Sequence, residues 1–225
     1  PLRLVGSEMC IRDSLYKGKN ITSGDTIIMK FYNKELNSII VSGGAQGKYI
    51  PNTKADGSTF PLIYSADKLD YFLKDENTNL SGNAQTRHDN TDLKAGFIKV
   101  NWKTRILKAF SRDWADSTSS YLKPSIIEKG RDPMVGNEMT YNLDTRRGKI
   151  NYGKTKADDG FYRGSEIRNE SNKTIYIKNS IFTTCDLDTP HFHFESEKMK
   201  IIQDDVVIAK PIILKIAEIP VFGIP

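Results

Sequence analysis

Apolar and polar residues alternate along much of this chain. Ile98 and Val100 flank Lys99, and Ile175 and Ile177 are separated by one residue and followed by Lys178. An alternation with a period of two is typical of strands that bury one face. No long segment carries apolar residues at helical spacing, while Tyr, Phe, Ile and Thr are plentiful. The pattern predicts an all-β fold built from antiparallel strands.

A short motif recurs along these strands. A small residue is followed by an apolar residue three positions later and by another apolar or aromatic residue two positions further on. The copies are Gly24-Ile27-Met29, Ala66-Leu69-Tyr71, Ala95-Ile98-Val100, Gly136-Met139-Tyr141 and Ser196-Met199-Ile201, with a degenerate copy at Gly164-Ile167-Asn169. The copies recur about every 30 to 40 residues, which is typical of stacked repeat units.

Units that bury one face must stack on their neighbours. We therefore expect an elongated, open, two-walled roll of stacked antiparallel strands around an apolar trough. The same alternation is also compatible with the core of an ordinary β-sandwich, so the pattern alone leaves both architectures open.

Composition narrows the class of function. The chain has 225 residues, 38% of them hydrophobic, and a net charge of +5 without a polybasic run. The scattered charge argues against nucleic acid as a partner. The longest apolar stretch, from Val206 to Leu214, is interrupted by Lys210 and Pro211, so no membrane-spanning helix is expected.

The first fourteen residues differ in character from the rest. Their VGSEMCIRDS stretch resembles a translated sequencing-adapter read, so residues 1–14 are expected to be an unstructured artefact and Cys10 to be foreign. Cys185 is then the single native cysteine. The Gly43-to-Lys48 stretch lacks the spacing of a phosphate-binding loop and is interpreted as a turn.

Four blocks in the second half carry a family resemblance. MTYNLDTRRGKI, DDGFYRGSEIR, the long block IYIKNSIFTTCDLDTPHFHFESEKMKII and PIILKIAEIPVFGIP follow one another in residues 139–225. In this order they resemble the periplasmic domain of the LptD family of lipopolysaccharide-assembly proteins, also called OstA-type, in its Bacteroidota-like form. Residues 63–109 resemble the generic OstA-like repeat that the soluble bridge protein LptA shares. The TTC and PVFGIP blocks are the most discriminating.

The resemblance implies a lipid-conducting function. Members of the family have a periplasmic β-jelly roll, here expected over residues 15–216, whose apolar groove accepts the acyl chains of lipopolysaccharide from an LptA-like periplasmic bridge protein. The groove passes the lipid to a C-terminal outer-membrane β-barrel that works with an LptE-like lipoprotein. Residues 217–225 would form the junction to that barrel, which the sequence lacks. The implied location is the periplasmic face of the outer membrane.

The resemblance and the alternation together predict the roles of individual residues. By resemblance, Cys185 of the Thr183-Thr184-Cys185 block forms a disulfide with a cysteine of the barrel; without the resemblance it would be an inert thiol. The candidates for the lipid groove are the inward positions Ile98, Val100, Met139, Tyr141, Ile167, Ile175, Ile177, Met199 and Ile201.

Catalysis and cofactors are not expected. Asp188, His191 and His193 lie near Cys185, but their spacing fits no zinc site, and His193 is placed on the solvent face of a strand that follows a turn at residues 190–192. Two alternatives remain open: a stand-alone LptA-like bridge protein, and a β-helical polysaccharide-active enzyme with paired carboxylates on a concave face.

Overall fold

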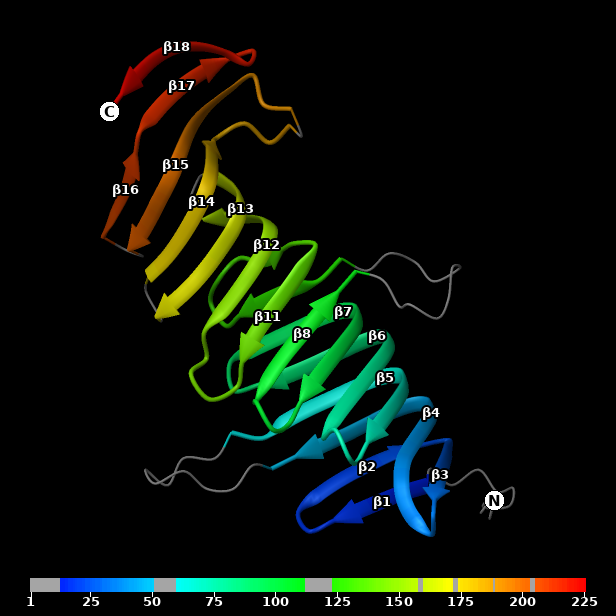
Figure 1. The fold of residues 1–225 in the computed structure, drawn as a ribbon. Coiled ribbons are helices and arrows are strands. Elements are labelled where there is room, and N and C mark those ends of the chain that lie inside the picture. Colours follow the sequence, from blue (N-terminus) through cyan, green and yellow to red (C-terminus); the bar gives the residue numbers. More distant parts are fainter. Residues whose placement is uncertain are drawn as a thin grey trace. The chain divides into compact units, whose positions relative to one another are not determined.

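The computed structural model describes residues 13–50, 60–111, 123–157, 160–171, 174–187, 189–202 and 205–225. These residues form antiparallel strands and contain no helix, which confirms the predicted all-β class (Figure 1). Accordingly, the described part of the chain has no helix of the length and apolarity needed to cross a membrane. The strands belong to two compact units, Pro1–Pro124 and Ser125–Pro225.

The first unit is an antiparallel meander whose strands pair with their neighbours in sequence, except where β4 pairs with both β2 and β3. Its strands are β1 (Asp13–Lys17), β2 (Asn20–Gly24), β3 (Thr26–Tyr32), β4 (Glu35–Tyr49), β5 (Leu62–Phe72), β6 (Asn77–His88), β7 (Thr91–Asn101) and β8 (Ile106–Phe110).

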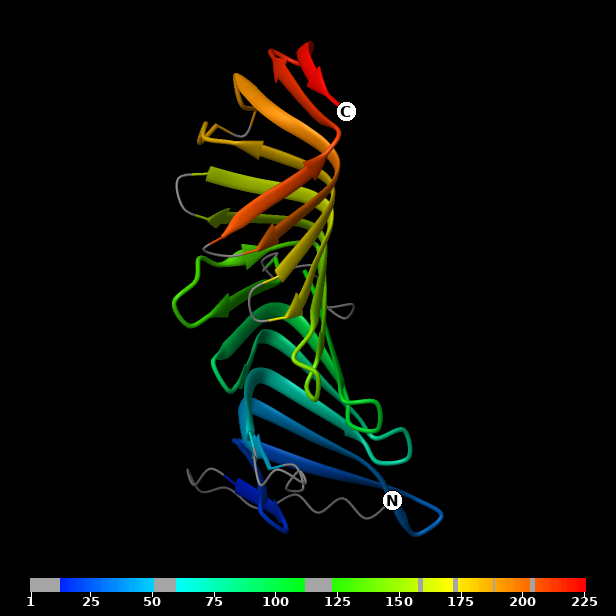
Figure 2. The same cartoon turned by 90° about the vertical axis from the view of Figure 1, so that its left-hand side faces the viewer.

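The long strands of this unit bend in the middle, as their curvature in Figure 2 shows. Strand β4 pairs with β3 through residues 35–42 and with β2 through residues 46–48. The halves on either side of the bend form two walls. Wall A contains β3, β8 and residues 35–42, 68–72, 77–81 and 97–101; wall B contains β1, β2 and residues 45–49, 62–66, 84–88 and 91–95.

The bend of β4 lies at Gly43 and Gly44, both of which have positive φ angles. The register with β5 shifts between Ser42 and Ala45 at this point, so the two glycines form a bulge inside one strand. The prediction from the sequence that Gly43 to Lys48 form a turn was therefore wrong. Residues on both sides of the bulge continue the ladder with β5, and short-range turn composition cannot distinguish a bulge from a chain reversal.

The second unit repeats this construction. Its strands are β9 (Ser125–Glu128), β10 (Met134–Val135), β11 (Glu138–Asn142), β12 (Gly148–Ala157), β13 (Gly160–Ser171), β14 (Thr174–Thr183), β15 (Phe192–Ile202), β16 (Val206–Lys210), β17 (Ile212–Ile216) and β18 (Ile219–Ile224). Wall C contains β11, β16 and residues 148–151, 166–169, 174–178 and 198–202. Wall D contains β10, β17, β18 and residues 153–157, 160–164, 180–183 and 192–196.

The recurring sequence motif has a structural explanation. Its small residue lies at the bend, and its first apolar residue lies on a cross-strand row that faces inward. In the first unit the row runs Ile27, Val41, Leu69, Leu80, Ile98 and Ala109, and in the second Met139, Ile150, Ile167, Ile177 and Met199. Each residue is the Cα partner of the next, so one row of aliphatic side chains lines each unit.

The small residue is required because the neighbouring strand packs over the bend. A Cβ atom at Gly24, Gly136 or Gly164 would overlap a methyl group of Val41, Ile150 or Ile177, respectively. The copies that run in the opposite chain direction were not recognised in the sequence. Ile175, Ile177 and Ser180 form one of them, because an antiparallel neighbour carries the same motif reversed.

The predicted domain boundaries remain predictions, although some residues near them are described. Asp13 and Ser14, from the segment expected to be an artefact, lie in β1 and pair with Gly24 and Ser23. Residues 1–12, including Cys10, lie outside the described residues. Within the expected junction, β18 pairs with β17 as a hairpin.

Candidate functional site

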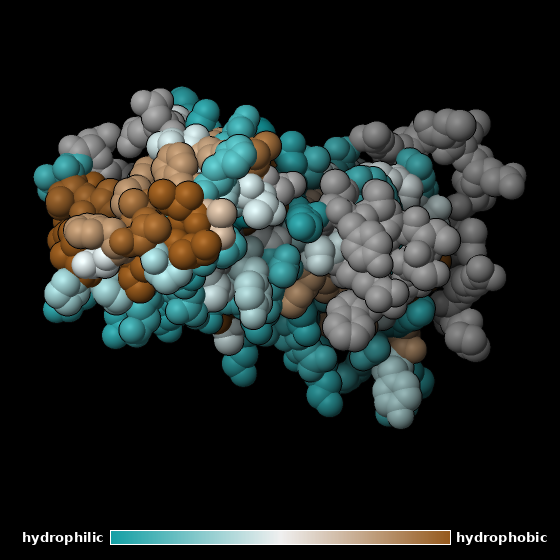
Figure 3. Space-filling view, turned by 90° about the horizontal axis from the view of Figure 1, so that it is seen from above, coloured by the Kyte–Doolittle hydropathy of each residue, from teal (hydrophilic) through white to brown (hydrophobic). Residues whose placement is uncertain are grey.

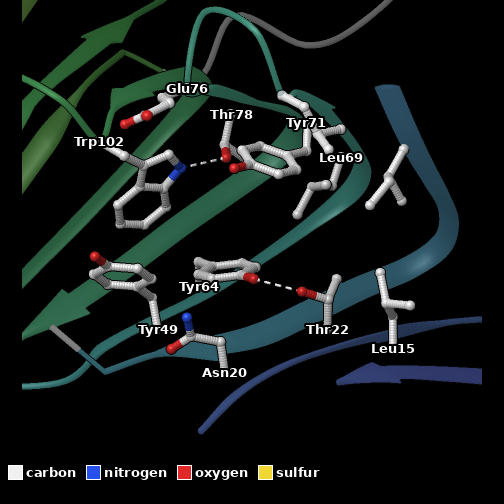
Figure 4. Close-up of a pocket in the computed structure, with 12 residues that line it drawn as sticks. Leu15, Asn20, Thr22, Tyr49, Tyr64, Leu69, Tyr71, Glu76, Thr78 and Trp102 are labelled. Carbon is white, nitrogen blue, oxygen red and sulfur yellow. Dashed lines mark hydrogen bonds between the residues drawn. The ribbon is translucent and has the colours of Figure 1, made fainter. Parts of the chain in front are cut away.

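The first unit contains a cavity of about 420 Å³ between its two walls. Figure 4 shows the lining as two facing rows of side chains. Wall A and the turns that follow it contribute Ile39, Leu69, Tyr71, Leu73, Glu76, Thr78 and Trp102, and wall B contributes Leu15, Asn20, Thr22, Tyr49 and Tyr64. Eight of these twelve residues are aliphatic or aromatic, and the other four are polar.

The polar atoms of two lining aromatic residues are bonded to their own walls. The Tyr64 hydroxyl and Thr22 Oγ1 share a hydrogen bond of 2.7 Å, and the Trp102 indole N–H donates to Thr78 Oγ1 over 2.7 Å. Burial raises the pKa of Tyr64, so its hydroxyl stays neutral. Because these polar atoms are satisfied by the walls, the rings themselves are left to line the cavity.

Two aromatic residues of the lining, one from each wall, contact each other. The rings of Tyr49 and Trp102 meet with centroids 4.2 Å apart. Arg105 donates to the Tyr49 hydroxyl over 2.9 Å, and its guanidinium lies 5.4 Å from the centre of the same ring. This cluster joins wall B to the β7–β8 turn of wall A, and it sets the spacing of the walls beside the cavity.

The cavity presents little charge to a ligand. Burial, followed by the nearby Glu76 carboxylate, raises the pKa of Tyr71 and keeps that phenol neutral. Glu76 is the acidic residue of the lining, and it is exposed to solvent in the β5–β6 turn. The described lining offers apolar surface and neutral hydroxyls, an arrangement suited to binding an apolar group rather than to proton transfer.

The nine residues predicted from the sequence to line a groove are all buried. Ile98 and Val100 lie on β7 in the first unit, and the others lie on wall C of the second: Met139, Tyr141, Ile167, Ile175, Ile177, Met199 and Ile201. The cavity of the first unit is lined by different residues. That the nine side chains line a lipid path stays a prediction.

Sequence reasoning named none of the aromatic residues of the cavity as groove candidates, although Tyr71 belongs to one copy of the motif. Tyr49 and Trp102 lie at the ends of strands, outside every copy of the motif, and Tyr64 lies on the half of β5 that precedes its bend. The alternation of Leu62, Tyr64 and Ala66 was an available signal, because all three are buried on one face.

Cys185 follows the end of β14 and carries a free, half-buried thiol. Its backbone N–H donates to Thr183 Oγ1 over 3.1 Å, and its Sγ lies 3.7 Å from Nδ1 of His191. Thr183 in turn donates its hydroxyl to the Phe192 carbonyl over 2.7 Å, so the TTC block is tied to the start of β15. The disulfide to a barrel cysteine stays a prediction.

The two histidines lie in different environments. His191 is exposed just before β15, in agreement with the predicted turn into a strand. The placement of His193 on the solvent face was wrong, because its side chain is buried on β15 with 3% of its surface exposed. The inward positions of β15 begin at His193 and continue through Ser196 across the bend, which shifts the alternation. No group of three or more metal-binding side chains occurs among the described residues.

Comparisons with known proteins give a likeness in structure. No family model matches the chain, and no curated protein matches it in sequence. Among solved structures, the chain is similar to LptH from Pseudomonas aeruginosa, described as the LptA homologous periplasmic component of the conserved lipopolysaccharide transport device. The match has 14% sequence identity and a TM-score of 0.46, and it covers 52% of this chain and 78% of that one.

Proposed function

We propose that this chain is a non-catalytic, periplasmic lipid-binding module that accepts acyl chains of lipopolysaccharide between its β walls. The finer form of the proposal is an LptD-like module, which receives the lipid from an LptA-like bridge protein. It passes the lipid to an outer-membrane barrel accompanied by an LptE-like lipoprotein. The family assignment rests on the TTC and PVFGIP blocks and their order in the sequence.

The observation that carries the lipid-binding proposal is the cavity between walls A and B. An acyl chain has no hydrogen-bonding capacity, and its transfer from water to an apolar site is worth about 0.8 kcal/mol per buried methylene. Aliphatic side chains such as Leu15, Leu69 and Leu73 provide that environment, and the aromatic hydroxyl of Tyr64 is already satisfied by the protein. A catalytic site would need convergent acidic and basic groups, and Glu76, which is exposed, is the one carboxylate of the described lining.

The aliphatic row of each unit supports a conducting function. Val41, Leu69, Leu80 and Ile98 are consecutive cross-strand partners in the first unit, so similar side chains follow one another across the strands. A ligand that moves along such a row exchanges one aliphatic contact for another of similar energy. This favours a conduit over a site with one deep minimum.

Photo-crosslinking in cells that make lipopolysaccharide tests the proposal. A benzophenone amino acid replaces Leu73, which lines the cavity, or its neighbour Phe72, which is exposed and does not line it. We expect lipopolysaccharide adducts from position 73 and none above background from position 72. Equal labelling at both positions, or none at either, would contradict acyl-chain binding in the cavity.

The LptD-like form is tested separately from lipid binding. The product of the intact gene should be retained in the outer-membrane fraction after a high-salt wash. Recovery of the mature protein in the soluble periplasmic fraction would instead support the stand-alone bridge protein.

A further inference from the structure

The outward face of wall C carries lysines in direct opposition. Lys178 of β14 is the Cα partner of Lys198 of β15, which is the partner of Lys210 of β16. Lys200 lies on the same face two residues from Lys198, opposite Tyr176. Like charges directly opposite one another on neighbouring strands are destabilising, so this row costs the fold stability unless something else compensates it.

Among the described residues, the carboxylate closest to this lysine row lies at its Lys178 end. Lys178 lies 3.1 Å from Glu166, a carboxylate that already pairs with Lys149 and Arg168. Lys198 lies at 3.9 Å from its neighbour Glu197, with both side chains largely exposed. The amino group of Lys200 lies over the Tyr176 ring, 5.7 Å from its centre. The lysines on β15 and β16 are therefore available to an external anion.

Exposed aliphatic residues lie on the same face as these lysines. Ile208 is the Cα partner of Lys200, and Val206 is the partner of Ile202. Ile208 and Val206 expose 52% and 42% of their surface. Further exposed apolar residues lie on β18 of wall D, and Figure 3 shows a hydrophobic patch over the C-terminal strands. A patch of this kind beside charged residues marks an interaction surface.

We propose that this face, defined by Lys198, Lys200, Lys210, Val206 and Ile208, docks on the surface of an anionic lipid bilayer. The interface of such a bilayer offers phosphates and hydrocarbon within about 5–10 Å of each other, so one surface can satisfy both the lysines and the aliphatic side chains. A nucleic acid would satisfy the lysines alone. A symmetric second copy would place the same lysine rows against each other, which repels.

Vesicle co-sedimentation of the whole chain tests this docking surface. Vesicles of phosphatidylcholine alone are compared with vesicles that also contain phosphatidylglycerol. We expect binding to the anionic vesicles, weakened at high salt, and little binding to the neutral ones. In the triple variant Lys198→Gln, Lys200→Gln, Lys210→Gln, affinity for anionic vesicles should fall on the order of 100-fold, from about 1 kcal/mol per lysine.

Two further variants separate the charge and apolar contributions. Ile208→Ser should weaken binding to anionic vesicles by about tenfold while leaving the fold intact, because the side chain is already half exposed. The matched control is Lys94→Gln, Lys99→Gln, Lys108→Gln in the first unit, which removes the same charge from other exposed lysines. It should change the affinity less than twofold.

Several results would overturn the proposal. Equal binding to both vesicle types would show that the lysine row does not contribute to binding. Equal losses of affinity in the triple variant and in its control would show that net charge, and not this face, determines binding. Sedimentation velocity without lipid tests whether a second copy of the chain binds to this face. A dimer that Ile208→Ser dissociates would assign the face to a second copy of the chain instead.

Discussion

Gly164→Ala tests whether the bend of β13 requires a residue without a side chain. Gly164 lies at the bend of β13, where a Cβ atom would overlap Cγ2 of Ile177 and approach the Lys178 carbonyl oxygen to 3.0 Å. Ile177 has 1% of its surface exposed and belongs to the aliphatic row, so it cannot move away without disturbing its neighbours. Overpacking of this kind costs about 1–3 kcal/mol.

The unfolded chain offsets part of that cost. Replacing glycine by alanine reduces the entropy of the unfolded state and stabilises a protein by about 0.4–1 kcal/mol where the native backbone allows it. The net effect expected for Gly164→Ala is a loss of roughly 1–2 kcal/mol in the free energy of unfolding. Gly148→Ala is the matched control on β12, because its nearest neighbours lie at 3.8 and 3.9 Å, in ordinary van der Waals contact. It should be neutral or slightly stabilising.

Urea unfolding followed by far-ultraviolet circular dichroism measures the difference. At unchanged slope, the transition midpoint should fall for Gly164→Ala and stay or rise for Gly148→Ala. The double variant Gly164→Ala, Ile177→Ala should lose less stability than the sum of its single variants, because the added methyl group then enters the space that Ile177 vacates. Equal midpoints for the two glycine variants would refute the explanation of the sequence motif.

Three further predictions concern single side chains. The Lys149 ammonium, and to a lesser extent Lys178 and Arg168, lower the pKa of Glu166 to about 2. The stabilisation from the ionised Glu166 is therefore complete above the usual carboxyl pKa near 4.5 and is lost as the pH falls towards 2. The difference in unfolding free energy between the wild type and Glu166→Gln, measured at a series of pH values, should shrink over that interval. Tyr64→Phe should cost about 1 kcal/mol in unfolding free energy by removing the hydrogen bond to Thr22; no loss in urea unfolding would mean that the bond contributes nothing. Under the LptD-like proposal, Cys185 of the full-length protein should resist alkylation until it is reduced, and full alkylation without reductant would contradict the proposed disulfide.

The sequence predicted the strands better than the path they follow. Alternation identified the inward positions of the core, including Ile98, Ile167 and Ile177, because side-chain direction depends only on the local pleat. It could not locate the bends, where the alternation shifts. His193 was misplaced for this reason, and the double-glycine bulge in β4 was mistaken for a turn.

The cavity could not be predicted from the periodicity of the sequence, for a different reason. Tyr49 and Trp102 are separated by more than fifty residues in sequence, and their contact depends on how far apart walls A and B stand. That spacing is set by side-chain volumes and by the Arg105 contact with Tyr49, both of which are tertiary properties. A periodicity indicates which face of a strand is buried, but not whether the opposing faces meet or leave space between them.

Trp102 provides the most direct test of acyl-chain binding in the cavity. With Trp114 replaced by phenylalanine, Trp102 is the single tryptophan, since the chain has two. A lipid with a brominated acyl chain, whose bromine atoms quench tryptophan on contact, is titrated into this protein and followed by fluorescence. Acyl-chain binding in the cavity predicts saturable quenching that Leu73→Asp abolishes and Phe72→Asp preserves, since Leu73 lines the cavity with Trp102 and Phe72 does not. Absence of quenching, or identical quenching in the two variants, would contradict it.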